Sequence, residues 1–235
     1  MSLVAGHGPL STQPAGWFSP PITGNEVYVE PHPRRIEAFI GDTRVIDTEQ
    51  ALMVHRAGHA LSYAFPRDVI GNLPHEPVAE APDHVSVPWD AVDRWVEEGR
   101  ALVHYPPNPY HRIDCRPTRR GLRVQVGDAV LVDTDDTVIV FETALAPRLY
   151  VAPALVRVDA LQRSATSSYC NYKGTATYWS AVMGDTVVED VAWSYPDPPP
   201  ESLPIKDFLS FDATRADVLA ELPGLQADPA CGCEL

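Results

Sequence analysis

Basic residues and cysteines are both scarce in this chain of 235 residues. Lysine and arginine number 18 against 32 aspartates and glutamates, which gives a formal net charge of −14. Nucleic acid polymers are bound mainly through Lys/Arg contacts to phosphate, so we do not expect so acidic a chain to bind them. A single nucleotide needs only a few local groups and stays compatible with this charge. Four cysteines are too few for a secreted disulfide scaffold.

Long apolar runs and targeting signals are missing as well. The sequence has no run of about 18 apolar residues, so no membrane span is expected. Residues 1–17 have neither a basic start nor an apolar core, so no signal peptide is expected. Hydrophobic residues still make up 45% of the chain, which is enough to build a core. We therefore expect a folded, soluble, cytoplasmic protein without a membrane partner.

Motifs for common metals and cofactors are also absent. The sequence contains no CxxC pair, P-loop or GxGxxG. His55 and His59 have the spacing of helical ligands, but their surroundings are strand-like and no third ligand is near. Cys231 and Cys233 stand close to the C-terminus, where a flexible tail is expected rather than a soft-metal site. We expect no metal ligands, no structural zinc and no cofactor, and the oligomeric state stays open.

Proline, by contrast, is abundant and clustered. The 24 prolines gather mainly at 20–35, 104–120 and 194–204. Proline lacks a backbone donor and fixes φ, so these stretches are connectors or edge segments. Between them apolar and polar residues alternate with a period of two, which predicts a mainly β protein.

One arrangement of strand and turn signals occurs twice. Two stretches of the sequence align, RRIEAFIGDTRVIDTEQALMV and RGLRVQVGDAVLVDTDDTVIV. Gly41 in the first and Gly127 in the second are 86 positions apart. Each glycine precedes an aspartate in a hairpin signal. Tyr63 and Tyr150 also match, at an offset of 87. We interpret the pattern as two copies of one β-rich unit rather than as two unrelated hairpins.

The two predicted copies differ in their later parts. Residues 1–105 should form a degenerate first copy that ends in a short helix at 89–102, where apolar residues fall on one helical face. Residues 106–235 should form the second copy, with another short helix at 215–225. Because only the second copy holds a dense set of reactive side chains, a site should belong to it or to the junction.

The stretch YCNYKGTATYWS at 169–180 contains that dense set. Cys170 is a candidate catalytic nucleophile if its thiolate is stabilised, and Lys173 is the nearest cation in sequence. A lysine partly buried among aromatics can also serve as a catalytic base or Schiff-base amine. The alternative is structural, because free cysteine is often a small buried hydrophobe and aromatics favour strands.

Strand alternation predicts which of these side chains share a face. Lys173 and Trp179 should lie on one face, and Tyr172 and Tyr178 on the other. Gly174 and a nearby alanine leave room that a ligand could fill. A cationic lysine would favour an anionic or carbonyl-bearing small molecule. The residues we expect to bind this ligand are Tyr172, Tyr178, Trp179, Trp193, Tyr195, His111 and Arg112, with Cys170 at the floor.

These segments resemble a known family. CNYKGTATYWS and VAWSYPDPPPESLPIKDFLSF are similar to the Cys-Pro-Tyr/Phe-Lys-Gly-x-Ala-x-Tyr-Trp and Trp-Ser-Tyr-x-x-Pro signatures of the bacterial and fungal family called domain of unknown function 427. PYHR at 109–112 resembles a stretch that recurs in its two-copy members. Asn171 departs from the pattern, since the family usually has proline there.

The resemblance implies two tandem β-tent-like domains with short helices and a small-ligand or catalytic pocket with aromatic walls. It also implies a nucleotidyltransferase, although we find no glycine-serine motif followed by paired aspartates to hold Mg²⁺. Three functions therefore stay open: an enzyme that uses Cys170 or Lys173, a binding protein with an aromatic cage, and a nucleotide-handling transferase.

Overall fold

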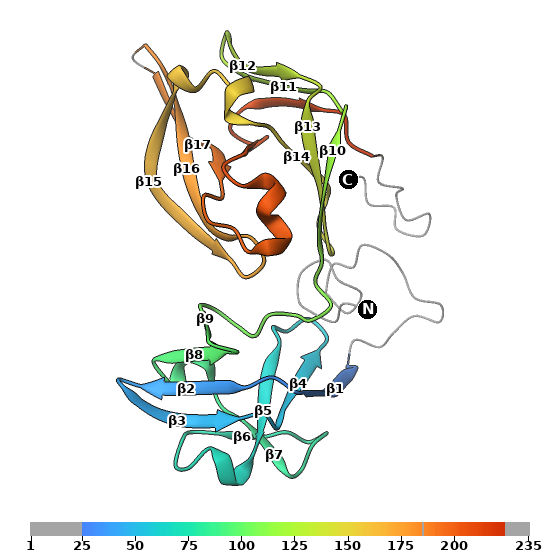
Figure 1. The fold of residues 1–235 in the computed structure, drawn as a ribbon, viewed down its shortest axis with the longest axis vertical. Helices are drawn as coiled ribbons and strands as arrows, with labels where there is room; N and C mark the ends of the chain where they lie inside the picture. The colour runs from blue at the N-terminus through green and yellow to red at the C-terminus, as the bar shows by residue number, and fades with distance from the viewer. Residues whose placement is uncertain (1–24, 185, 224–235) are drawn as a thin grey trace. The chain divides into compact units, whose positions relative to one another are not determined.

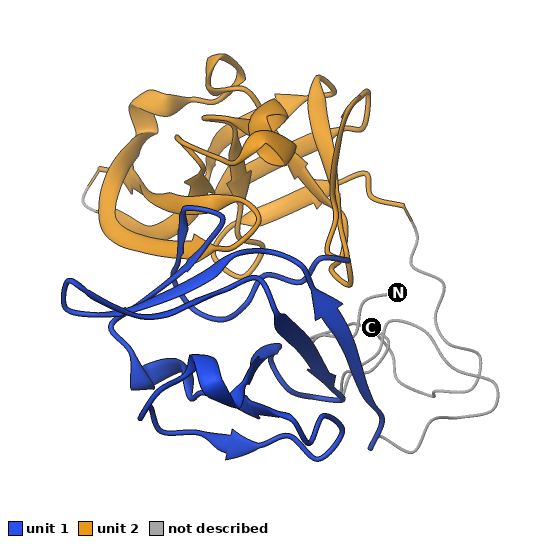
Figure 2. Ribbon diagram, turned by 60° about the horizontal axis from the view of Figure 1, so that its bottom comes forward, with its two compact units in different colours: residues 1–110 blue, residues 111–235 orange. Residues whose placement is uncertain are grey.

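The computed structural model describes residues 25–184 and 186–223. These residues confirm a mainly β fold of antiparallel sheets with short 3-10 helices (Figure 1). The chain divides into two compact units, residues 1–110 and 111–235 (Figure 2). None of the helices within the described ranges is both long and apolar enough to cross a membrane.

Unit 1 is built from two sheets that bury a common core. The core contains Ile36, Met53, Phe65 and Trp95. The first sheet has the order β1 (Val27–His32), β4 (Ala51–Arg56), β5 (Ser62–Pro66), β7 (His84–Ser86) and β6 (Glu76–Pro77). The second has the order β3 (Thr43–Thr48), β2 (Ile36–Ile40), β8 (Arg94–Glu97) and β9 (Arg100–Leu102). The short helices are η1 (Arg67–Val69) and η2 (Trp89–Ala91).

Unit 2 is built from three sheets. They are β10 (Ile113–Thr118), β13 (Thr137–Glu142) and β14 (Arg148–Tyr150); β12 (Ala129–Thr134), β11 (Leu122–Val126) and β19 (Asp217–Ala220); and β15 (Leu161–Cys170), β16 (Gly174–Met183), β17 (Thr186–Ser194) and β18 (Leu209–Phe211). The short helices are η3 (Pro153–Leu155), η4 (Val158–Ala160) and η5 (Pro200–Ile205). Figure 1 shows the long curved strands β15 and β16 on one side of the unit, β10 and β13 on the other, and η5 between them.

Strand pairing repeats between the two units at a constant shift. Val27 faces Arg56 in the β1–β4 ladder, and Ile113 faces Glu142 in the β10–β13 ladder, so both partners move by 86 positions. The β2–β3 and β11–β12 ladders show the same shift, and each has a register irregularity at the matching place. The turn glycines of these two hairpins both have φ of +55°, a conformation that glycine adopts without steric cost. These matching registers support the interpretation of one repeated β unit.

The expected match of Tyr63 with Tyr150 is wrong. Leu52 faces Ala64, and Val138 faces Tyr150. Since Leu52 and Val138 are themselves 86 apart, it is Ala64 that corresponds to Tyr150. The sequence suggested otherwise because the Tyr-x-x-Pro pattern occurs in both copies but is shifted by one residue relative to the ladder.

The helix expected at 89–102 is also wrong. A single 3-10 turn at Trp89–Ala91 is followed by the hairpin of β8 and β9. β8 pairs with β2 on one side and with β9 on the other, so sheet pairing satisfies its backbone groups. The helix expected at 215–225 is likewise replaced, over Asp217–Ala220, by strand β19, which pairs with β11. In both places tertiary pairing overrides a helical spacing of apolar residues.

The largest difference between the units is the long hairpin of β15 and β16. In unit 1 the chain passes from η1 at Arg67–Val69 to the two-residue strand β6 within a few residues. In unit 2 the corresponding connection contains β15, β16 and the nine-residue strand β17, which pairs with β18. The motif at 169–180 therefore lies on structure for which the described part of unit 1 has no counterpart.

Candidate functional site

Half-buried aromatic and thiol side chains from two sheets of unit 2 gather around a small apolar core. We call this set the aromatic cluster. Its buried members are Ile113, Val138, Val140, Tyr150, Ala176, Tyr195 and Ile205, and its half-buried members are Cys115, Cys170, Tyr172, Tyr178, Trp193 and Phe208.

Alternation along β16 and β17 places Tyr178 and Trp193 in the aromatic cluster. Tyr178 faces Trp193 across the ladder, and their ring centroids lie 6.5 Å apart with planes tilted by 41°. Tyr195 lies two residues after Trp193 and so shares its side of the chain. The structure thus brings together most of the predicted ligand residues from the two strands.

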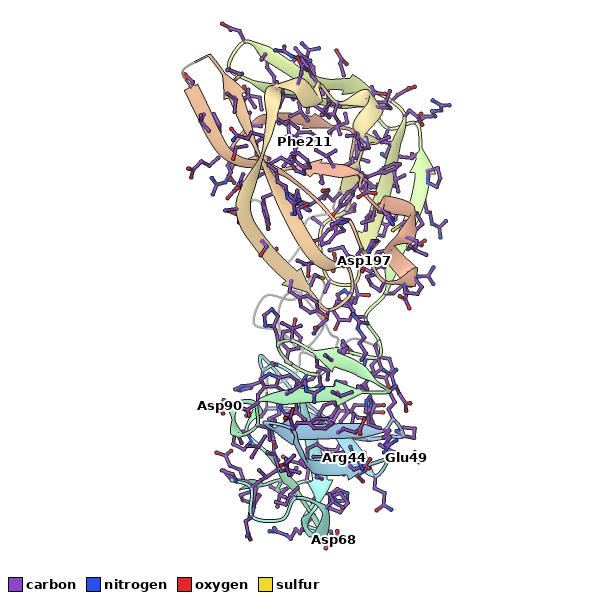
Figure 3. All side chains as sticks on the ribbon, turned by 60° about the vertical axis from the view of Figure 1, so that its left-hand side comes forward. Arg44, Glu49, Asp68, Asp90, Asp197 and Phe211 are labelled. Carbon is purple, nitrogen blue, oxygen red and sulfur yellow. The ribbon has the colours of Figure 1, made fainter. Side chains whose placement is uncertain are left out.

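Gly174 does not create the room for a ligand that the sequence suggested. Its φ is +84°, and a Cβ there would lie 3.0 Å from the carbonyl oxygen of Asp197. The nearest atoms to that position belong to the backbone and rings of 197–199 (Figure 3 labels Asp197). Gly174 therefore serves a left-handed turn and the close approach of another backbone segment.

A buried charged network borders the aromatic cluster. Lys173 is 9% exposed, and its Nζ donates a hydrogen bond to Oε2 of Glu142, at the end of β13. His111 Nε2 donates to the other carboxylate oxygen at 3.1 Å. The His111 ring stacks on Tyr172, with centroids 3.6 Å apart and planes 9° from parallel. We call Glu142, Lys173 and His111 the Glu142 network.

The Glu142 carboxylate is held ionised by its two partners. Burial alone would raise its pKa, but the hydrogen bond from His111 and the charge of Lys173 outweigh burial and hold the pKa below its usual value. The Lys173 Nζ also lies 5.9 Å from the centre of the Tyr195 ring. The amine is therefore engaged as a paired cation at the edge of the aromatic cluster.

The two free thiols of the aromatic cluster have different surroundings. Cys115 Sγ lies 3.9 Å from the carbonyl oxygen of Glu201, and burial together with the charge of Asp114 raises the pKa of the thiol. Cys170 ends β15 and faces Gly174 across the hairpin. Because Lys173 directs its hydrogen bond to Glu142, the amine is not committed to the Cys170 thiol as the sequence suggested.

Tyr150 is a cluster residue that the sequence reading did not assign to the site. It is 2% exposed, and the Trp193 Nε1 donates to its hydroxyl at 3.3 Å. Tyr195 is 7% exposed in the same cluster. In the sequence Tyr150 served only to align the two copies. The equivalent ladder position in unit 1 holds an alanine, and this difference could have marked Tyr150 as a site residue.

Two predicted ligand residues lie away from the aromatic cluster. Trp179 packs against the other core of unit 2, and its Nε1 donates to Ser194 Oγ at 3.2 Å. It does not share a face with Lys173, because β16 begins only at Gly174 and the lysine precedes it in a turn. The Arg112 side chain is 73% exposed and pairs with Asp114 at 3.3 Å.

A surface depression lies across β11, β12 and β19, is lined by Arg123, Asp133 and Leu219 among others, and contains none of the predicted site residues. Within residues 25–184 and 186–223, no group of three or more His, Cys, Asp or Glu side chains is placed to hold a metal ion.

The face of unit 1 that corresponds to the aromatic cluster is aliphatic. At the shift of 86, Tyr150 corresponds to Ala64 and Glu142 to Arg56. Val54, Ala64 and Val78 form the small core there. Neither the phenols nor the buried carboxylate are thus repeated at the equivalent positions of unit 1.

Unit 1 has a different buried network, on its main core. Glu97 accepts hydrogen bonds from Tyr63 at 2.5 Å, His32 at 2.9 Å and Arg34 at 2.5 Å. Burial would raise the pKa of Glu97, but these three donors lower it to about 2. This network fixes strands β1, β5 and β8 to one another.

Sheet order and the aromatic cluster define unit 2 as an antiparallel β domain with a partly buried group of aromatic side chains. Residues 114–221 match the family model NTP_transf_9, described as Domain of unknown function (DUF427). The match confirms the family resemblance and covers one segment, from β10 to just beyond β19. The chain matches no curated protein.

Proposed function

We propose that unit 2 binds a small planar molecule at the aromatic cluster. Trp193, Tyr178 and Tyr172 supply aromatic surface, and the Glu142 network supplies polar groups at its border. The supporting observation is the juxtaposition of half-buried rings with a nearly inaccessible ion pair. Small-molecule sites combine mostly apolar walls with a few fixed polar groups in this way.

The energetics of the Glu142 network favour a functional role over a purely structural one. Replacing a buried ion pair by apolar residues is often neutral or stabilising, so the pair is weak evidence for stability. Unit 1 shows that the shared β framework forms with Ala64 and Val54 on the equivalent face. The framework therefore does not require the charged network that unit 2 carries.

The geometry supports binding more directly than covalent catalysis. Lys173 is paired with Glu142, so an attack by its amine would first require loss of a proton that the carboxylate stabilises. The Cys115 thiol has a raised pKa, which lowers its thiolate fraction. Cys170 stays the candidate nucleophile should the bound molecule prove to be a substrate.

Trp193 provides a direct test of the proposed site. Planar aromatic fragments should show saturation transfer in ligand-observed NMR with the full chain, and Trp193→Leu should weaken their binding. A well-stacked ring contributes about 1 kcal/mol beyond burial, or roughly fivefold in Kd. Trp179→Leu is the matched control, because it removes an indole from the opposite face of the same sheet. Equal losses in both variants, or no binding by any fragment, would refute the proposal.

The family label favours a second candidate, nucleotide transfer. Lys173 and His111 are groups that could contact a phosphate if a ligand displaced the Glu142 carboxylate. Equilibrium dialysis of the chain against ATP, GTP, CTP and UTP with Mg²⁺ tests this candidate. Retention that depends on Lys173 and on Mg²⁺ would favour the transferase over the aromatic-ligand site.

A further inference from the structure

Two phenols of the aromatic cluster donate no hydrogen bond to a described residue. Tyr195 is 7% exposed, and its hydroxyl makes no hydrogen bond with any described residue. Tyr150 is 2% exposed, and its oxygen accepts a hydrogen bond from Trp193 while its own proton is not donated. Tyr178, another phenol of the cluster, shares a hydrogen bond with Ser168 Oγ at 2.9 Å.

The fully buried side-chain atoms that lack a partner in the described residues belong to other residues, so the Tyr195 hydroxyl, which no described group accepts, keeps some access to solvent. A hydroxyl that is accessible and has no protein acceptor is free to donate to a molecule that enters the cluster from outside. Burial raises the pKa of both phenols, and the neighbouring Cys170 and Glu142 add to the effect. Both hydroxyls therefore stay protonated at neutral pH and act as donors.

Charges around these phenols fit a ligand that accepts hydrogen bonds. Lys173 lies over the Tyr195 ring and is balanced by Glu142. The Arg148 guanidinium lies 4.9 Å from the centre of the Trp193 ring and donates to the Phe211 carbonyl. The two cations that lie close to rings of the cluster favour a ligand that brings a lone-pair oxygen.

We infer that the ligand of the proposed site presents an acceptor oxygen, a carbonyl or a carboxylate on a planar group, to the hydroxyls of Tyr150 and Tyr195. This inference rests on the proposed function and specifies its ligand class. The aromatic walls would hold the plane of the ligand, and the two phenols would fix the direction of its oxygen.

A matched set of probes tests the inference by holding the ring constant and changing the polar group. Benzamide, benzoate and benzylamine are titrated into the full chain and followed by ligand-observed NMR. Benzamide or benzoate should bind more tightly than benzylamine, and whichever is tighter identifies the oxygen as neutral or anionic. Tyr150→Phe and Tyr195→Phe should each weaken the preferred probe by roughly three- to tenfold, as expected for one lost hydrogen bond.

Tyr169→Phe is the control, because it removes a phenol from β15 that does not belong to the aromatic cluster. Thermal melting of each variant excludes unfolding as the cause of lost binding. The inference is overturned if probe binding depends on Trp193 but has the same affinity in both phenylalanine variants as in the native chain. It is also overturned if benzylamine binds best. A different result would overturn the proposed function itself, and this inference with it. In that case none of the probes binds, and Trp193→Leu causes no loss of binding in a wider set of fragments.

Discussion

Ala64 and Tyr150 occupy the same ladder position in the two units, one facing Leu52 and the other facing Val138. The strands around them pair in the same register, so the side chain alone distinguishes the two places. In unit 1 the alanine packs in a small aliphatic core, whereas in unit 2 the tyrosine joins the aromatic cluster. Strands that pair in matching registers thus surround a small aliphatic core in unit 1 and the aromatic cluster in unit 2.

Breaking the Glu142 network on one side should destabilise unit 2. Glu142→Gln removes the counter-charge of the buried Lys173 and should cost about 3–5 kcal/mol of unfolding free energy. The double variant Glu142→Gln/Lys173→Met removes both charges and should recover most of that loss. Chemical denaturation followed by fluorescence measures both values.

The exposed pair of Arg123 and Asp133 serves as the control for this cycle. Their side chains are 42% and 63% exposed, so Asp133→Asn should change the unfolding free energy by less than about 1 kcal/mol. If Glu142→Gln proved as mild as the control, the Glu142 network would be solvated rather than buried.

Replacing Gly174 with alanine should lower the melting temperature more than the same replacement at Gly184, in the next turn of the same sheet. Gly174 has φ of +84° and a backbone oxygen 3.0 Å from the place of a Cβ, whereas Gly184 has φ of +59° and nothing within 4 Å. Gly184→Ala therefore measures the cost of a left-handed alanine, about 1 kcal/mol. Gly174→Ala adds a clash with Asp197 and should lower the melting temperature further. Equal melting temperatures would show that the 197–199 segment can move aside.

Much of this architecture could be predicted from the sequence, because period-two alternation and turn glycines are local signals. The hairpin turns at Gly41 and Gly127 and the shift of 86 were readable for this reason. The helix at 89–102 was mispredicted because nothing local reveals that β2 provides a pairing partner for β8.

The candidate site could be predicted only in part, for a similar reason. Alternation brought Tyr178, Trp193 and Tyr195 together correctly, since they lie on regular strands or next to one. It misplaced Lys173, which lies in the turn before β16. Glu142 was missed altogether, because a carboxylate at the end of a distant strand meets the lysine only through tertiary packing.

The network around Glu97 predicts how the stability of unit 1 depends on pH. Its hydrogen-bond donors lower the pKa of Glu97 to about 2, below its usual 4.5. A lowered carboxyl pKa stabilises the native state above the unfolded pKa, and that contribution is lost as the pH falls from about 5 towards 2. The contribution is on the order of 3 kcal/mol at neutral pH. Thermal melts across this window should show a decline that Glu97→Gln flattens, with a lower melting temperature at pH 7. A variant that melts like the native chain at every pH would contradict this account.

Removing the Tyr195 hydroxyl should leave stability unchanged or slightly higher, in contrast to most deletions of buried groups. Tyr195→Phe keeps the ring in the aromatic cluster and deletes a donor that no described residue accepts, so no protein hydrogen bond is lost. Tyr63→Phe is the matched comparison, because Tyr63 is also a buried residue and its hydroxyl donates to the Glu97 carboxylate at 2.5 Å. A hydrogen bond to a charged group contributes about 1.5–3 kcal/mol, so this variant should unfold more readily. Parallel urea denaturation of the two variants and the native chain gives the comparison. A loss for Tyr195→Phe as large as that for Tyr63→Phe would mean that its hydroxyl already has a partner in the folded protein, and it would remove the main reason to expect an acceptor oxygen from a ligand.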